Sequence, residues 1–186
     1  LEAPAAGRFS PDAALPDSGA ALLFVGSTRG QFRPAVRGAL TSDRADELSV
    51  YGVGWEEFIE VDRISGEFLD NDQLPAAYAG AGIVLSDHHP EMAADGFLSN
   101  RLFDAVATGA RVVSDSAAGL EDVFGDAVVV FTDEDDLVDI LHTPVDDTFP
   151  SRDRRVEVAM AIARAHSFDA RAGVLINSVR ELKGAQ

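Results

Sequence analysis

Six short stretches rich in apolar residues recur along this chain, separated by polar turns and by segments with helical spacing. Short apolar runs of this kind are typical of strands that lie buried in a parallel sheet. The predicted strands are residues 20–25, 48–51, 66–69, 83–85, 111–114 and 127–131. Because helical segments alternate with them, the pattern predicts an α/β fold: a doubly wound, Rossmann-like parallel sheet of about six strands with helices on both faces.

The segments between the predicted strands carry apolar residues at the spacing of one helix face. These predicted helices cover residues 32–40, 74–81, 99–107 and 135–141, with a short helical turn within 116–126. Two more follow: residues 152–165, with Val156, Ala159, Met160 and Ala163 inward, and a last helix that Ser167 opens. We expect residues 86–95 to form a polar loop without structure of its own, and residues 144–150 to form a breaker-rich connection.

The segment from Asp95 to Asp115, DGFLSNRLFDAVATGARVVSD, runs from a polar loop into a helix and then directly into an apolar strand. Ser99 or Asn100 can cap this helix, whose start offers unpaired N–H groups and a partial positive charge that suit a phosphate. Asn100 and Arg101 in the first turn can reach the same anion, and Asp104 one turn further on can accept hydrogen bonds from ribose hydroxyls. The same order of elements occurs in α/β domains whose helix starts bind nothing, so the local pattern leaves both possibilities open.

Two further loops at the same predicted edge of the sheet carry polar residues. Gly26 begins a small turn after the first strand, and Arg29 and Arg33 flank that turn, which places cations near a possible phosphate position. The alternative is a solvated turn with surface arginines. His88 and His89 are adjacent and cannot share a helix face as a metal pair would, so a sugar or phosphate contact, or solvent exposure, is favoured over metal binding.

The composition narrows the class of protein. The 186 residues, 46% of them apolar, suit one compact domain, whereas residues 1–19 lack periodicity and predict a linker or extended arm that adds nothing to the core. The net charge of -17 argues against nucleic-acid or anionic-membrane partners, so an anionic ligand would need local arginines. The absence of cysteine excludes disulfides, and no apolar run is long enough for a transmembrane segment, so we expect a cytoplasmic protein.

Five blocks of the sequence carry a resemblance to a known family. They are AALLFVGS, GEFLDNDQLPAAYAGAGIVLS, DGFLSNRLFDAVATGARVVSD, GLEDVFGDAVVVF and HSFDARAGVL, and they cover nearly the whole chain from Ala20 onward. In this order they resemble the C-terminal nucleotide-sugar domain of two-domain (GT-B) glycosyltransferases, closest to the group-1, family-4-like type found in spore-maturation-like proteins. GRFSP at residues 7–11 resembles the linker that precedes this domain, and the chain begins at Leu1 rather than Met. The resemblance implies that residues 20–186 are a donor-binding domain and that an N-terminal acceptor domain belongs to the same protein.

The resemblance also implies an activity and site residues. The activity is a retaining hexosyl transfer from a nucleotide-diphosphate sugar, without metal or other cofactor, to an acceptor whose identity the sequence leaves unknown. In the family a Glu-x7-Glu motif brackets the loop and the helix start. Here Asp104 stands at the second, ribose-binding position, and the first falls on Gly96, or on Asp95 with one residue inserted. Ser27 replaces a family arginine that neutralises the diphosphate, and residues 69–71 correspond to the segment that contacts the base.

Two other interpretations stay open at this point. The departure from the Glu-x7-Glu motif favours a non-catalytic Rossmann-like interaction module, and the fold is shared by sugar-nucleotide epimerases, for which His88 and His89 would be the candidate acid-base residues. In the leading interpretation Asp104 is the candidate catalytic residue, no residue is a metal ligand, and Arg29, Arg33 and Arg101 are candidates for the diphosphate. The full set of candidate donor-binding residues is Gly26, Ser27, Arg29, Arg33, Leu69, Asn71, His88, His89, Gly96, Phe97, Leu98, Ser99, Asn100, Arg101 and Asp104.

Overall fold

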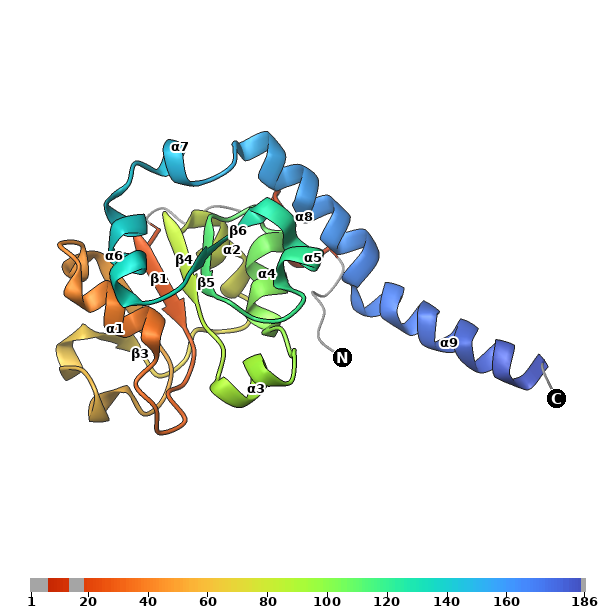
Figure 1. Ribbon diagram of the computed structural model, residues 1–186, viewed down its shortest axis with the longest axis horizontal. Helices are drawn as coiled ribbons and strands as arrows, with labels where there is room; N and C mark the ends of the chain where they lie inside the picture. The colour runs from red at the N-terminus through yellow and green to blue at the C-terminus, as the bar shows by residue number, and fades with distance from the viewer. Residues whose placement is uncertain (1–6, 14–18, 185–186) are drawn as a thin grey trace.

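A computed structural model describes residues 7–13 and 19–184, in which six strands form one parallel sheet (Figure 1). The strands are β1 Leu22–Val25, β2 Leu48–Tyr51, β3 Ile64–Gly66, β4 Ile83–Ser86, β5 Val112–Asp115 and β6 Val128–Phe131. Their order in the sheet is β3-β2-β1-β4-β5-β6. The chain therefore builds outward from β1 to β3 and then returns to place β4 beside β1, where Leu22 pairs with Ile83. In such sheets, ligands bind beyond the carboxyl ends of the strands at this reversal.

Helices connect the strands and continue beyond the last of them. The α-helices are α1 Pro34–Thr41, α2 Leu74–Gly80, α3 Pro90–Ala94, α4 Asn100–Ala107, α5 Leu120–Phe124, α6 Glu134–His142, α7 Val145–Thr148, α8 Arg152–His166 and α9 Phe168–Gly184. Single-turn 3-10 helices lie at Ala45–Glu47, Trp55–Glu57, Val61–Arg63 and Gly125–Ala127. Figure 1 shows α9 extending away from the body of the domain. No helix in the described part of the chain is long and apolar enough to cross a membrane.

The two faces of the sheet carry two separate hydrophobic cores. Leu22, Phe24 and Leu85 point to one face and pack with α1 and α6, whereas Leu23 and Val84 point to the other and pack with α2, α4, α5 and α8. Successive residues of a strand point to opposite faces, so strands that are apolar at every position supply both cores. This is the doubly wound arrangement that the apolar runs predicted.

The predicted elements agree with the structure except at four places. The third strand lies at Ile64–Gly66 rather than at residues 66–69, because Ile64 pairs with Val50 of β2 and the chain leaves the sheet after Gly66. The expected loop at 86–95 contains α3, which Pro90 starts from its first-turn position. The expected connection at 144–150 contains α7.

The fourth correction concerns the inward face of α8. Its buried residues are Arg155, Val158, Ala159 and Ile162. Of the four residues predicted to face inward, Ala159 is buried, Val156 and Ala163 are half-buried, and Met160 is 50% exposed. The helix is rotated relative to the prediction because the Arg155 guanidinium is buried, where it donates hydrogen bonds to the carbonyl oxygens of Gly109 and Pro150.

The N-terminal segment 1–19 lies partly outside the described residues, which exclude 1–6 and 14–18. Within residues 7–13, Phe9 is 7% exposed and its ring centroid lies 6.3 Å from that of Tyr78. The expectation that nothing in this segment joins the core is therefore wrong at Phe9. An aromatic ring in an otherwise polar segment is the residue that gains most from burial against the domain.

Candidate functional site

The loop after β1 is fixed by backbone and side-chain hydrogen bonds at the carboxyl edge of the sheet. Gly26 N–H donates to the Tyr51 carbonyl oxygen at 2.7 Å, and the indole Nε1 of Trp55 donates to the Gly26 carbonyl oxygen at 2.8 Å. Trp55 is fully buried with its ring edge-on to Phe24. A Cβ at position 26 would lie 2.0 Å from Nη1 of Arg101, so a side chain there would displace the guanidinium from its present position. The loop therefore leaves room for one specific arginine.

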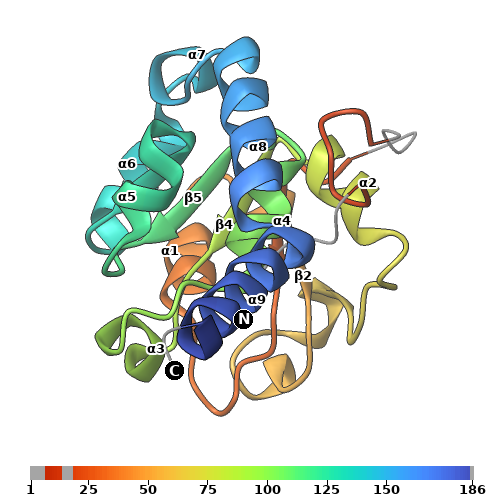
Figure 2. The same ribbon diagram turned by 90° about the vertical axis from the view of Figure 1, so that its right-hand side faces the viewer.

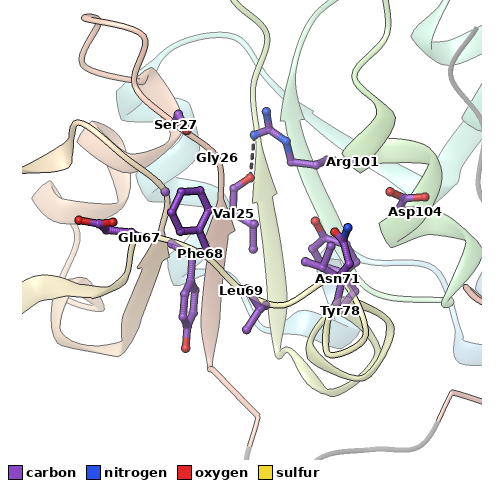
Figure 3. Close-up of a pocket in the computed structure, with 13 residues that line it drawn as sticks. Val25, Gly26, Ser27, Glu67, Phe68, Leu69, Asn71, Tyr78, Arg101 and Asp104 are labelled. Atoms are coloured by element: carbon purple, nitrogen blue, oxygen red, sulfur yellow. Dashed lines mark hydrogen bonds between the residues drawn. The ribbon is translucent and has the colours of Figure 1, made fainter.

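Arg101 lies in the first turn of α4 and reaches back over β1. Its Nη1 donates to the Val25 carbonyl oxygen at 2.7 Å (Figure 3). Burial lowers the pKa of Arg101 from its usual value, and a guanidinium nevertheless stays protonated in a protein. Arg101 lines two neighbouring pockets, so its charge lies at the junction between them.

The first of these, the Arg33 pocket, has a volume of about 210 Å³ and gathers cations. Its lining comprises Arg29, Arg33, Asp87, His89, Met92, Ser99, Asn100 and Arg101. Arg29 is exposed and has a positive φ of 51, a left-handed conformation that non-glycine residues rarely adopt. Ser99 is the residue preceding α4, and no side-chain hydrogen bond caps the helix there. The pocket thus combines three guanidinium groups with the start of a helix.

Arg33 is held inside this pocket by an ion pair. It is 1% exposed, and its Nη2 donates to the Asp87 carboxylate and, at 2.7 Å, to the Asp87 carbonyl oxygen. The second carboxylate oxygen of Asp87 accepts a hydrogen bond from Ala35 N–H at 3.0 Å. Burial raises the pKa of Asp87, while Arg33 and the Ala35 N–H oppose that change. The charge of Arg33 is therefore largely neutralised within the protein.

His89 accepts a hydrogen bond from Arg33, because Nη1 lies 2.8 Å from His89 Nε2 and a guanidinium can only donate. Burial, together with the charges of Arg33, Arg29 and Arg101, lowers the pKa of His89 to about 4. The imidazole is therefore neutral at pH 7.

His88 links three elements beneath the pocket. Its Nδ1 lies 2.6 Å from the Asp115 carboxylate, its backbone N–H donates to the same carboxylate, and its Nε2 accepts from Ser99 N–H at 3.2 Å. These partners require the neutral tautomer with hydrogen on Nδ1. His88 therefore ties β4 to the end of β5 and to the start of α4, and both of its ring nitrogens are used for that purpose.

The second pocket, the Tyr78 pocket, has a volume of about 280 Å³ and shares Arg101 with the Arg33 pocket. It is lined by Val25, Gly26, Ser27, Tyr51, Gly52, Glu67, Phe68, Leu69, Asn71, Leu74, Tyr78, Arg101 and Asp104 (Figure 3). Burial raises the pKa of Asp104 to about 7, and the Arg8 charge opposes this. Burial also raises the pKa of Tyr78. Phe68 is 75% exposed at the rim. The pocket offers apolar walls with a carboxyl group and an arginine at one side.

The sequence matches one known protein family over most of its length. A family model described as Glycosyl transferase-like matches residues 31–177, which is more than half of the chain. The chain belongs to this family. No curated protein sequence matches it.

Three solved structures share the fold of this glycosyl transferase-like chain. Sucrose-phosphate synthase from Thermosynechococcus elongatus matches with a TM-score of 0.68 and 17% identity, over 100% of this chain and 52% of that chain. AviGT4, a glycosyltransferase involved in avilamycin A biosynthesis, matches with a TM-score of 0.58 and 18% identity, over 96% of this chain and 55% of that chain. The GtfA/B complex matches with a TM-score of 0.53 and 11% identity, over 91% of this chain and 38% of that chain. At these identities the likeness shows the fold, that of one half of a GT-B glycosyltransferase, and the chain spans about half the length of the first two.

The residues predicted for the site of this glycosyl transferase-like domain fall into three groups. Gly26, Ser27, Leu69, Asn71, Arg101 and Asp104 line the Tyr78 pocket. Arg29, Arg33, His89, Ser99 and Asn100 line the Arg33 pocket together with Arg101. The remaining residues line neither pocket: His88 is buried beneath, Gly96 and Phe97 are exposed, and Leu98 packs against a hydrophobic core.

Sequence reasoning missed several residues of the site. Asp87 and Asp115 each lie at the carboxyl end of a buried strand, and an acidic residue directly after an apolar run is a signal that could have found them. Tyr78 lies within the predicted helix at 74–81 and Phe68 within the predicted strand at 66–69, and the structure places both in the lining of the Tyr78 pocket. Within residues 7–13 and 19–184, no cluster of three or more His, Cys, Asp or Glu side chains suits a metal ion.

Proposed function

We propose that this chain is the donor-binding half of a retaining, metal-independent glycosyltransferase and that it holds a nucleotide-diphosphate sugar at the carboxyl edge of its sheet. The observation that carries the proposal is the position of Arg101 between the Arg33 pocket and the Tyr78 pocket. A charged group between a cation-rich pocket and a partly apolar one suits a ligand with a diphosphate at one end and a nucleoside at the other.

The diphosphate belongs in the Arg33 pocket. In a chain of net charge -17, an anion needs a local concentration of cations, and three arginines meet here. Because Asp87 neutralises Arg33, Arg29 and Arg101 supply most of the attraction, and the start of α4 adds its partial positive charge. Neutral His89 adds no further cation at pH 7.

The nucleoside belongs in the Tyr78 pocket. Asp104 lies one helical turn beyond Arg101, where its carboxyl group can bond to ribose hydroxyls, and residues 69–71 offer backbone groups to the base. The exposed ring of Phe68 at the rim gives the base an aromatic surface to stack on. The sugar would then extend past Arg101 toward the loop between β4 and α4.

The acceptor has to come from another domain of the protein. Transfer needs the acceptor hydroxyl within about 3–3.5 Å of the anomeric carbon, and holding both reactants there supplies much of the rate. The two pockets form one open wall at the sheet edge, and the structural relatives are about twice as long as this chain. We therefore propose that the 186-residue chain binds the donor without transferring its sugar.

Calorimetric titration with UDP, GDP and dTDP tests the proposal. At least one nucleotide should bind, and Arg101→Ala should weaken that binding by about 10- to 150-fold, the value of one hydrogen bond to a charged group. Arg180→Ala on the exposed part of α9 removes the same charge far from the pockets and should leave binding unchanged. Absence of heat with all three nucleotides would favour the interaction module instead. Sugar transfer by the isolated chain would overturn the division between two domains.

A further inference from the structure

A third pocket, the Arg111 pocket, lies at the opposite edge of the sheet from the proposed donor site. It has a volume of about 380 Å³ and is lined by Pro11, Asp12, Ala13, Ala79, Thr108, Gly109, Arg111, Arg152, Arg155 and Val156. Arg111 precedes β5, whereas Asp115 at the other end of β5 bonds to His88; the strand places roughly 13 Å between them. Figure 2 shows the start of α8 at one end of the domain and α3 at the other. We propose that this pocket binds a small phosphate-bearing anion.

Three arginines, Arg111, Arg152 and Arg155, line this pocket, and none of them forms an ion pair with a described residue. Asp12 is the acidic residue in the lining, and Asp146 acts on Arg155 from a distance. All three arginines line the same pocket, and burial, together with the charges of Arg111 and Arg152, lowers the pKa of Arg155. Such repulsion is costly, and a bound anion would relieve it.

Of the three arginines, only Arg155 has a structural role among the described residues that accounts for its position in the pocket. Arg155 is 8% exposed and donates a hydrogen bond to the Gly109 carbonyl oxygen at 3.0 Å. This bond supplies a partner for a backbone acceptor just after the end of α4. Arg111 has no such role: its Nε is buried and has no hydrogen-bond partner among the described residues. Arg152 is exposed in the first turn of α8. Arg111 and Arg152 therefore bring charge to the pocket that capping of α4 does not require.

The start of α8 adds to the positive potential. This helix has 15 residues, and Ser151 caps it by accepting a hydrogen bond from Arg154 N–H at 3.3 Å. The partial positive charge of a helix start favours phosphate, and guanidinium groups match phosphate oxygens in pairs. The volume exceeds that of one phosphate ion, so a phosphomonoester fits the pocket better than phosphate alone. This proposal stands independently of nucleotide binding at the other edge.

Backbone NMR titration of the 186-residue chain tests the site. Inorganic phosphate and glycerol phosphate are added at constant ionic strength, with chloride as the reference anion, and the amides of Thr108 and Gly109 report on the Arg111 pocket. We expect saturable chemical-shift changes at these amides with both phosphates and none with chloride. The titration curves should give a higher affinity for the monoester than for inorganic phosphate. Shifts that confine themselves to Gly26 and Asn100 would place the phosphate at the donor edge and overturn the proposal.

Substitutions separate a specific site from general attraction. Arg152→Gln and Arg111→Gln should each weaken phosphate binding at Gly109 by about tenfold or more. Arg180→Gln removes an equal charge from α9 and should leave it unchanged. Equal affinity in Arg152→Gln and the unchanged chain would refute the site, and so would an equal loss in Arg180→Gln. Because Arg152 is exposed, its substitution keeps the test valid even if Arg111→Gln fails to fold.

Discussion

Replacement of Gly26 by alanine tests whether Arg101 is the residue that holds a nucleoside diphosphate. The new Cβ would lie 2.0 Å from Nη1 and 2.9 Å from Cζ of Arg101, so the guanidinium has to move by more than about 1 Å to reach van der Waals contact. Gly26 does not have a positive φ, and its N–H bond to Tyr51 does not involve the side chain, so the backbone accepts alanine. The change therefore displaces the guanidinium to which we assign the diphosphate, without altering it chemically.

The expected magnitude follows from the bonds that Arg101 makes. Loss of its 2.7 Å hydrogen bond to the Val25 carbonyl oxygen should lower the free energy of unfolding by about 1 kcal/mol. Loss of one charge-assisted bond to the diphosphate should weaken nucleotide binding by about 1.5–3 kcal/mol, or about 10- to 150-fold. Calorimetry with the tightest-binding nucleoside diphosphate measures the second quantity, and urea unfolding measures the first.

A double-mutant cycle shows whether the loss acts through Arg101. In an Arg101→Ala background the same Gly26→Ala change should cost less than about 0.5 kcal/mol of binding, because the displaced group is already gone. Gly173→Ala on α9, where a Cβ meets nothing within 4 Å, is the matched control and should leave nucleotide binding unchanged. If Gly26→Ala binds nucleotide as the unchanged chain does, or costs equally in both backgrounds, the assignment of Arg101 is wrong.

Three further substitutions test the buried charges of the site. The pKa of Asp104 is raised to about 7, so the native state keeps this proton at pH values where the unfolded chain has lost it, and stability falls as pH rises from about 4 to 7. Asp104→Asn should remove this fall and, in urea unfolding at pH 8, should be more stable than the unchanged chain by on the order of 1–3 kcal/mol. An unchanged pH dependence would contradict the burial of Asp104 as the cause. The pKa of His89 is lowered to about 4, so the free energy of unfolding should fall as pH drops from about 6.5 to 4. His89→Asn should flatten this part of the plot of unfolding free energy against pH, and an equally steep fall in the variant would mean that other groups cause it. Asp87→Asn leaves the buried Arg33 without its counter-charge and should lower the unfolding free energy by about 3–5 kcal/mol, whereas a loss below about 1 kcal/mol would show that the pair contributes little.

The local pattern of apolar and polar residues predicted most of the fold. Apolar runs located five of the six strands to within about two residues, because a strand buried on both faces has to be apolar at successive positions. The predicted helix at 135–141 is α6, which Asp133 caps: its carboxylate accepts a hydrogen bond from Asp136 N–H at 2.9 Å. Strand β3 escaped the pattern because it is only three residues long and none of its residues, Ile64, Ser65 and Gly66, is fully buried. The family resemblance, drawn from five ordered blocks, is confirmed by the family model and the shared fold.

The tertiary structure decided which polar residues meet. The sequence by itself placed Arg33 near a phosphate position and left His88 with a sugar contact or solvent exposure. In the structure each is paired with an aspartate at the carboxyl end of another strand: Arg33 with Asp87, and His88 with Asp115. These pairs are 54 and 27 residues apart, and no periodicity encodes them. Sequence patterns report which side of an element is buried, because that depends on neighbours three or four positions away. Which charge faces which depends on strand order and helix rotation, and these are set by the packing of the whole domain, as the burial of Arg155 and Phe9 shows.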